Sequence, residues 1–294
     1  MIDKSAVETT SPLLGRAAVV RRDDRIFPET RWIGAFIVLV LVVAATILYL
    51  MPDRTKDFFA WEIKPTMTPL LMGAGYLSGA WFFIRAFFSP KWHRVGWGFL
   101  AITAFTWFMG ITTILHWNKF TPGHISFYAW ANLYFVTPFL VPFLWYRNRV
   151  TDPGTPDPDD VVVPQWVRLA STVIGAGMLV IALFLFLLPD VAIGLWPWKL
   201  TPLTARVVAG WFALPGVVGL VLPRDSRWSA WRIMLEAQVI ALVLILVAVA
   251  RAWGEFDAGN WTTWGFTGGI TLLLAAVITL YTTMELGRRR GVAA

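Results

Sequence analysis

The stretch Trp-Asn-Lys-Phe-Thr-Pro-Gly at residues 117–123 recurs in outline as Trp-Gly-Glu-Phe-Asp-Ala-Gly at residues 253–259. Both copies follow the pattern Trp-x-x-Phe-x-x-Gly, and each joins one long apolar run to the next. A second match lies upstream of each copy. Residues 52–70 contain Pro-Asp, then Trp61, then Thr-Pro-Leu, and residues 189–203 contain Pro-Asp, then Trp196, then Thr-Pro-Leu. Because the copies are separated by similar intervals, the sequence indicates one structural unit that is used twice.

The composition excludes an ordinary soluble domain. Of the 294 residues, 57% are hydrophobic and only 15% are charged, whereas a typical soluble protein has about 25% charged residues. The apolar residues are gathered in blocks of about 20, which is long enough to cross a hydrocarbon core about 30 Å thick. Since every backbone amide in lipid needs an internal hydrogen-bond partner, we predict that these blocks are helices.

We predict membrane spans over residues 32–51, 68–88, 95–116, 124–146, 164–188, 201–222, 228–251 and 260–284. Thr68 and Thr201 each precede a proline at the start of a span, where a capping hydroxyl and a proline at the first helical position are common. The sequence thus predicts eight transmembrane helices in an all-α polytopic membrane protein.

The eight spans divide into two halves, at residues 32–150 and 164–285, which are joined by a Pro- and Asp-rich linker at residues 151–163. Residues 1–31 form an N-terminal tail, and residues 286–294 form a basic C-terminus. Because each half crosses the membrane an even number of times, both halves enter it in the same direction. We therefore predict two parallel four-helix repeats, related by an axis along the membrane normal.

Basic residues predict the orientation of the chain. The net charge of +7 would suggest a nucleic-acid partner in a soluble protein, but here Lys and Arg flank apolar runs, so we expect no nucleic acid. Most of the 25 Lys and Arg residues fall in the tails and in the loops on the same side as the tails. The other side holds the remaining ones, which are Arg54, Lys56, Lys64, Lys119, Lys199, Arg206 and Arg251.

This asymmetry predicts that both termini are cytoplasmic and that anionic lipids lie against the cytoplasmic face. We expect a multi-pass protein of the cell membrane, with the bilayer as its partner. The preference for Arg, Ala and Val over Lys and Ile favours a bacterial source. The chain has no cysteine, which excludes disulfides, thiol catalysis and thiolate metal sites. No nucleotide-binding loop, zinc-binding helix motif or nucleophile elbow is present, and we predict neither a cofactor nor a metal.

Glu236 is the most unusual intramembrane residue, because it lies eight positions into the seventh span, about 12 Å from its inner end. A carboxylate at that depth costs several kcal/mol and is a functional candidate by default. One interpretation is an intrahelical pair with Arg232, one turn away on the same face. The other is a role in transport or proton coupling. Gln238 lies close by in sequence, although it does not share the face of Glu236.

Arg206 lies about one turn inside the sixth span, where it has either a structural role or contacts an anion at the outer mouth. His116 and His124 bracket the first hairpin. Two histidines are too few for a metal site, which needs three or four converging ligands, and interfacial packing is the simpler interpretation.

The two hairpins contain further candidate residues, which are Trp117 and Phe120 in the first copy and Trp253, Glu255, Phe256 and Asp257 in the second. The acidic residues could attract a cation or could form a solvated rim. The aromatic residues could line a ligand cage, but Trp near both ends of the spans is typical of the aromatic belts at membrane interfaces.

The run Leu-His-Trp-x-Lys-Phe at residues 115–120 and the run Trp-Pro-Trp-x-Leu-Thr-Pro-Leu at residues 196–203 resemble stretches in uncharacterised bacterial multi-span membrane proteins. The resemblance covers most of the chain. It implies no activity and no catalytic residue.

Three functions remain open. The scarcity of intramembrane polar residues favours a non-enzymatic sensor, scaffold or accessory subunit with a packed interior. A transporter would place its path between the two halves, with Glu236 in the mechanism. A membrane-embedded enzyme is the third alternative, and only the neighbourhood of His116, His124, Glu255 and Asp257 could supply its clustered acid, base or metal groups.

Overall fold

The computed structural model describes residues 22–292, and these residues form an all-α fold in which eight helices are long and apolar enough to cross a membrane. The long helices are α1 (Pro28–Ala45), α3 (Met67–Phe88), α4 (Gly96–Leu115), α5 (Ile125–Asn148), α6 (Gln165–Leu187), α8 (Pro202–Val221), α9 (Trp228–Arg251) and α10 (Trp261–Val292). A π-helical turn at Thr46–Leu50 extends α1, and two short helices, α2 (Thr55–Phe58) and α7 (Pro189–Leu195), lie in loops.

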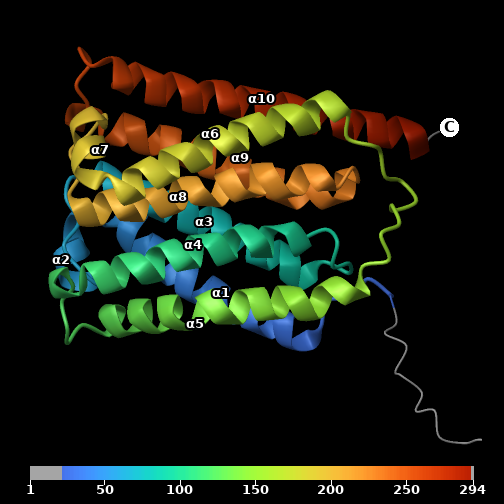
Figure 1. The fold of residues 1–294 in the computed structure, drawn as a ribbon, viewed down its shortest axis with the longest axis horizontal. Coiled ribbons are helices and arrows are strands. Elements are labelled where there is room, and N and C mark those ends of the chain that lie inside the picture. Colours follow the sequence, from blue (N-terminus) through green and yellow to red (C-terminus); the bar gives the residue numbers. More distant parts are fainter. Residues whose placement is uncertain (1–21, 293–294) are drawn as a thin grey trace, which may run out of the picture.

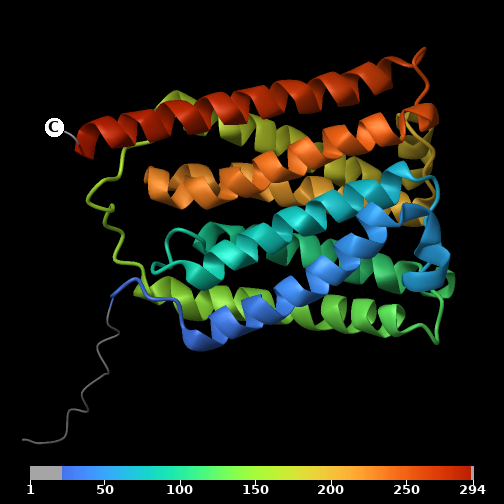
Figure 2. The ribbon, with the colours of Figure 1, turned by 180° about the vertical axis from the view of Figure 1, so that it is seen from behind.

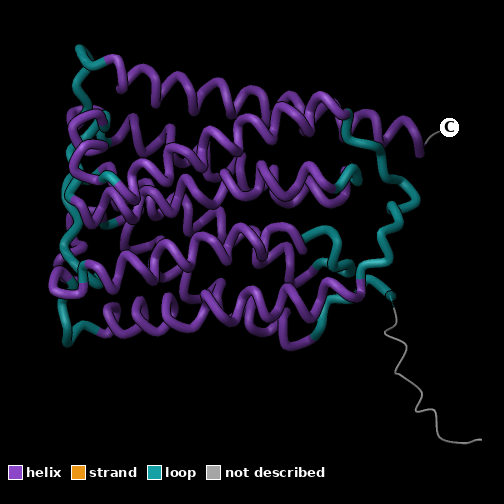
Figure 3. The backbone as a smooth tube through the Cα atoms, viewed as in Figure 1, coloured by secondary structure: helices purple, strands orange, loops and turns teal. Residues whose placement is uncertain are grey.

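The loops gather at two opposite ends of the molecule (Figure 3). We call these the hairpin end, with loops 51–66, 116–124, 188–201 and 252–260, and the linker end, with residues 22–27 and loops 89–95, 149–164 and 222–227. The first and last described residues both lie at the linker end (Figure 1), as an even number of long helices requires. The predicted N-terminal tail lies mostly outside the described residues.

The predicted spans are confirmed, and the largest differences from them occur at the two ends of the chain. The first helix starts at Pro28, inside the predicted tail, and Asp24 and Ile26 before it are already buried. The last helix continues to Val292, through most of the predicted basic C-terminus. There Arg288 is paired with Glu285 and Asp159, and these ion pairs hold the basic run in the helix.

The helices form two rows. In one row α1 packs on α3, α3 on α9, and α9 on α10, whereas in the other α6 packs on α8, α8 on α4, and α4 on α5. Figure 1 shows the second row in front, and Figure 2 shows the first. At the centre α3 also touches α8, and α4 touches α9. Each row thus combines the first two spans of one half with the last two spans of the other half. The two halves therefore contribute to the two rows in the same way, but to opposite rows.

Each half also has a group of packed aromatic residues at the hairpin end. In the first half Trp61 lies with its ring centroid 5.1 Å from Phe120 and 4.9 Å from Trp130. In the second half Trp198 lies 5.5 Å from Phe256 and 5.0 Å from Phe266. Trp198 thus packs beside the hairpin phenylalanine Phe256 as Trp61 packs beside Phe120, whereas the sequence matched Trp61 to Trp196.

Small residues let α6 and α8 approach closely. A Cβ atom built on Gly219 would lie 2.6 Å from Gly175 Cα and 2.7 Å from the Ser171 carbonyl oxygen, and one on Gly175 would lie 2.7 Å from Gly219 Cα. Backbone therefore packs directly on backbone, as in small-xxx-small contacts between membrane helices.

Candidate functional site

A cavity of about 920 Å³ lies between the two rows, and all eight long helices contribute to its lining. Its walls are largely leucine, isoleucine, valine, glycine and aromatic residues. Among the described residues, no Asp, Glu, Lys, Arg or His lines it. A cavity of this size and lining suits an apolar molecule far better than an ion or a polar solute.

Glu236 lies outside this lining, and its partners come from neighbouring helices. Arg85 of α3 forms an ion pair with its Oε2 atom, Trp81 Nε1 donates to the same oxygen at 3.2 Å, and the Tyr281 hydroxyl donates to Oε1 at 3.0 Å. The expected pair of Glu236 with Arg232 is wrong, since Arg232 pairs with Glu285 at 2.6 Å. Helices α3 and α10 flank α9 on either side and supply closer partners than the next turn of the same helix.

Gln238, an intramembrane polar residue that the sequence placed beside Glu236 but on another face of the helix, does line the cavity. It is a polar amide at the edge of an apolar space. Since it is only partly buried, it does not by itself define a binding group.

Arg206 and His116 are brought together at the hairpin end. Arg206 Nη1 donates to His116 Nε2 at 2.7 Å, and Arg206 Nε donates to the Phe186 carbonyl at 3.1 Å. Burial and then the nearby charges of Arg206 and Lys119 lower the pKa of His116, so its ring is neutral and can accept this bond. Arg206 thus joins α8 to the ends of α4 and α6, which is the structural role that the sequence left open.

The second hairpin stabilises a helix of the first half. Both oxygens of Glu255 accept backbone N–H groups, from Thr66 and Met67, at 2.7 Å each, and a carboxylate is favourable at a helix N-terminus. The predicted cap by Thr68 is wrong, because Thr68 is buried within α3 and accepts a bond from Trp198 Nε1. Thr201 does cap α8, in a reciprocal capping box with Thr204.

The remaining hairpin candidates have separate local roles. Asp257 Oδ1 accepts the Gly259 N–H within its own turn, and Phe120 and Phe256 are buried in the two aromatic groups. Trp117 packs on Phe127, and Trp253 stacks on Phe256. Among residues 22–292, the groups of ligand atoms close enough to hold a metal do not include His116, His124, Glu255 or Asp257. The structure therefore does not bring these four residues together as a metal-binding group.

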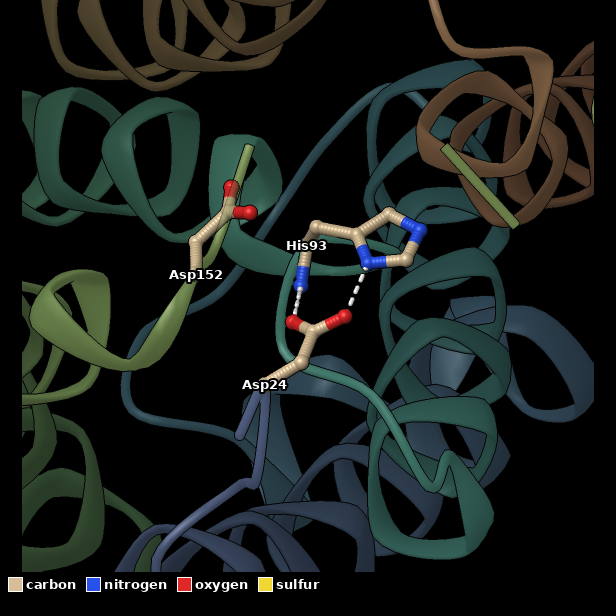
Figure 4. Close-up of side chains that lie close together, drawn as sticks. All are labelled: Asp24, His93 and Asp152. Atoms are coloured by element: carbon tan, nitrogen blue, oxygen red, sulfur yellow. Dashed lines mark hydrogen bonds and ion pairs between the residues drawn. The ribbon is translucent and has the colours of Figure 1, made fainter. Parts of the chain in front are cut away.

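A polar cluster at the linker end was missed by the sequence reasoning. His93 is fully buried, and Asp24 accepts bonds from both its backbone N–H, at 3.0 Å, and its Nδ1 atom (Figure 4). The other ring nitrogen lies 2.9 Å from Ser229 Oγ, and Asp160 accepts the Ser229 hydroxyl. Each residue lies in a different loop or helix end, so no spacing in the sequence could have identified this cluster.

Ion pairs surround this cluster and connect its segments. Asp157 is paired with Lys91 and Arg94, whereas Arg227 binds Asp152 at 2.8 Å and Asp225 at 2.7 Å. The linker predicted from composition is therefore held at Asp152 against loop 222–227 and at Asp157 against loop 89–95.

These ion pairs also set the pKa values of the linker-end acids. Burial alone would raise the pKa of Asp152, Asp157 and Asp225, but hydrogen bonds from Arg227, or from Lys91 and Arg94, outweigh it and hold each pKa below its usual value. The three carboxylates are therefore charged near neutral pH.

The cluster resembles a hydrolase triad in one respect only. Asp24, His93 and Ser229 follow the order of acid, base and hydroxyl. A nucleophilic serine must donate its hydroxyl hydrogen bond to the histidine, but Ser229 donates it to Asp160 instead. Asp24 and His93, together with Asp152, also have ligand atoms within 4.8 Å of one another, as a metal site requires. Arg227 already occupies both oxygens of Asp152. The geometry favours a structural clamp.

Acid should loosen this clamp. Because folding depresses the pKa of Asp152, Asp157 and Asp225, their contribution to stability is complete above the unfolded pKa of 3.8 and is lost as the pH falls through the folded pKa values. We expect the melting temperature of the purified protein in detergent to hold between pH 7 and 5 and to fall steeply below about pH 3.8. A melting temperature unchanged down to pH 2.5 would contradict this assignment.

The sequence matches no protein-family model, and no curated protein or solved structure shows significant similarity to it.

Proposed function

We propose that this chain is a non-enzymatic membrane protein, a sensor or accessory subunit, that holds a lipophilic molecule between its two rows of helices. One observation carries the proposal, namely the 920 Å³ cavity that all eight long helices line without a charged residue among those described. A largely apolar cavity among membrane helices suits molecules that are already dissolved in the bilayer.

The shape of the cavity favours an elongated molecule. Along α10 its lining extends from Phe266 to Met284, which corresponds to about 27 Å at 1.5 Å per residue. That length approaches the hydrocarbon thickness of a bilayer, about 30 Å. An acyl or isoprenoid chain is the kind of molecule that fills such a space.

We infer the membrane orientation from charge. The Lys and Arg residues concentrate on the side of the linker end, which we assign to the cytoplasm, facing the anionic lipids of a bacterial cell membrane. Two observations support two parallel four-helix repeats related by an axis along the membrane normal. The halves contribute equivalent helices to opposite rows, and each half has an aromatic group at the hairpin end. On this arrangement the cavity lies on the axis that relates the two halves.

Transport is the second candidate, because the lining spans nearly the whole membrane thickness and would allow a lipid to move between leaflets. The absence of charged groups from the described lining argues against a path for ions or polar solutes. Liposomes with a fluorescent lipid distinguish the two functions. The sensor or accessory function predicts no lipid exchange between leaflets beyond that of protein-free liposomes, whereas a transporter predicts exchange that scales with the protein content.

Occupancy of the cavity can be tested by filling it. Gly269 lines the cavity on α10, and a Cβ atom there would meet nothing within 4 Å, so a side chain can be added at this position without a clash at its Cβ atom. We expect the wild-type protein, purified into nanodiscs, to retain lipophilic molecules that mass spectrometry detects above the bulk lipid. Gly269→Phe should reduce this retained fraction about fivefold or more, because the new ring occupies the space.

Gly265→Phe is the matched control. Gly265 is on the same helix, also has open space at its Cβ position, and does not line the cavity. It should retain the wild-type amount of bound molecule. Equal retention by the wild-type protein and both variants would refute the proposal.

A further inference from the structure

Four aromatic residues of the cavity lining pack together. Tyr76, Phe105, Tyr134 and Trp211 each lie near the middle of a membrane helix, in α3, α4, α5 and α8 respectively, and all four line the cavity. Trp211 connects them, with its ring centroid 5.0 Å from Tyr76 and 4.4 Å from Phe105, while Phe105 lies 6.0 Å from Tyr134. Their depth places them near the bilayer midplane.

Two hydrogen-bond donors in this group have no acceptor among residues 22–292. Trp211 Nε1 is buried and makes no hydrogen bond. The Tyr76 and Tyr134 hydroxyls bond only to each other, at 2.8 Å, so one of their two protons is used and the other is not. Unsatisfied donors at this depth are destabilising, because no bulk water reaches them.

The packing of Trp211 fixes the direction of its free donor. A Cβ atom on Gly75 would lie 2.2 to 2.8 Å from the Cζ3, Cε3 and Cη2 atoms of the indole. The benzene edge is therefore pressed against α3. The opposite edge of the ring, which carries Nε1, faces away from that helix.

We propose that the molecule in the cavity carries an uncharged carbonyl oxygen, as a quinone, ketone or ester does, and that this oxygen accepts hydrogen bonds from Trp211 and from the tyrosine pair. This inference rests on the proposed function and specifies the ligand chemistry. An uncharged acceptor matches uncharged donors in an apolar cavity, whereas a carboxylate or phosphate would need a cation beside it. The surrounding rings also suit a flat conjugated ring, which stacks on aromatic faces.

The test compares two probes that differ chiefly in their oxygens. Decylubiquinone has carbonyl groups on its ring, whereas decylbenzene has the same alkyl chain and no oxygen. Purified protein in nanodiscs is incubated with either probe, and the bound amount is measured by chromatography after isolation. We expect the wild-type protein to hold about tenfold more quinone than hydrocarbon, as expected when one buried donor gains its acceptor.

Variants locate the donors. Trp211→Phe keeps an aromatic ring and removes the N–H group, so it should lower quinone binding about tenfold and leave decylbenzene binding unchanged. The double variant Tyr76→Phe and Tyr134→Phe removes the second donor by an independent change, and it decides the question if Trp211→Phe does not fold. Trp107→Phe, at an exposed position on α4 that packs on Phe139, is the control and should bind both probes as the wild-type protein does.

The outcomes separate the two proposals. If both probes bind equally and neither the Trp211 nor the tyrosine variant changes quinone binding, the carbonyl assignment is wrong and the lipophile-binding function stands. If neither probe binds the wild-type protein more than it binds Gly269→Phe, the function proposed for the cavity is itself refuted. Selective loss of quinone binding in both donor variants supports the assignment.

Discussion

Replacing Arg227 with alanine is expected to lower the free energy of unfolding by about 3–5 kcal/mol, the usual cost of removing one partner of a buried ion pair. The Arg227 side chain is only 11% exposed and bonds to Asp152 and Asp225 together. Its removal leaves two carboxylates unpaired at the linker end. It also removes the side-chain link between Asp152 of the linker and the loop between α8 and α9.

The measurement is denaturant or thermal unfolding of the purified variant in detergent at pH 7. Arg224→Ala, three residues earlier in the same loop, is the matched control. Its side chain is exposed and makes one bond, to the Leu220 carbonyl, so its effect should stay within about 0.5 kcal/mol. A loss in Arg227→Ala no larger than in Arg224→Ala would show that the clamp does not stabilise the fold.

Gly219→Ala is expected to destabilise the protein by about 1–3 kcal/mol, although it adds a single methyl group. The new Cβ atom would lie 2.6 Å from Gly175 Cα, and backbone cannot yield as a flexible side chain can. Helices α6 and α8 would have to separate along their contact, and the close packing that holds membrane helices together would be lost.

Gly177→Ala tests whether the effect comes from the contact. Gly177 lies on α6 two residues from Gly175, and a Cβ atom there meets nothing within 4 Å. Alanine has the higher helix propensity, so this variant should be neutral or more stable by up to about 1 kcal/mol. Unfolding in detergent would compare both variants with the wild type, and equal stability of all three would refute the close-contact account.

The spans could be predicted because lipid imposes a local requirement. A run of about 20 apolar residues must become a helix wherever it crosses hydrocarbon, so the existence and order of the long helices followed from the sequence. The capping box at Thr201 was likewise local, since its partner Thr204 lies three residues away. Phe120 and Phe256, at matching positions of the two hairpins, are both buried, but that the hairpins are copies of one unit stays a prediction.

Side-chain partners could not be predicted in the same way. Glu236 was assigned to Arg232, its nearest cation along the helix, but Arg85 reaches it from a helix about 150 residues earlier. Glu255 caps a helix of the opposite half. Such pairs depend on which helices become neighbours, and an apolar span carries little information about its neighbours.

The sequence by itself determined the number of long helices, the even number of crossings and the position of the two hairpins, because these follow from the transfer of apolar residues into lipid. Only the tertiary structure decided the rest. It placed His93 between Asp24 and Ser229, left Trp211 with a free donor, and opened a cavity between the rows. Each of these features requires residues far apart in the chain to meet, and that depends on how the rows pack.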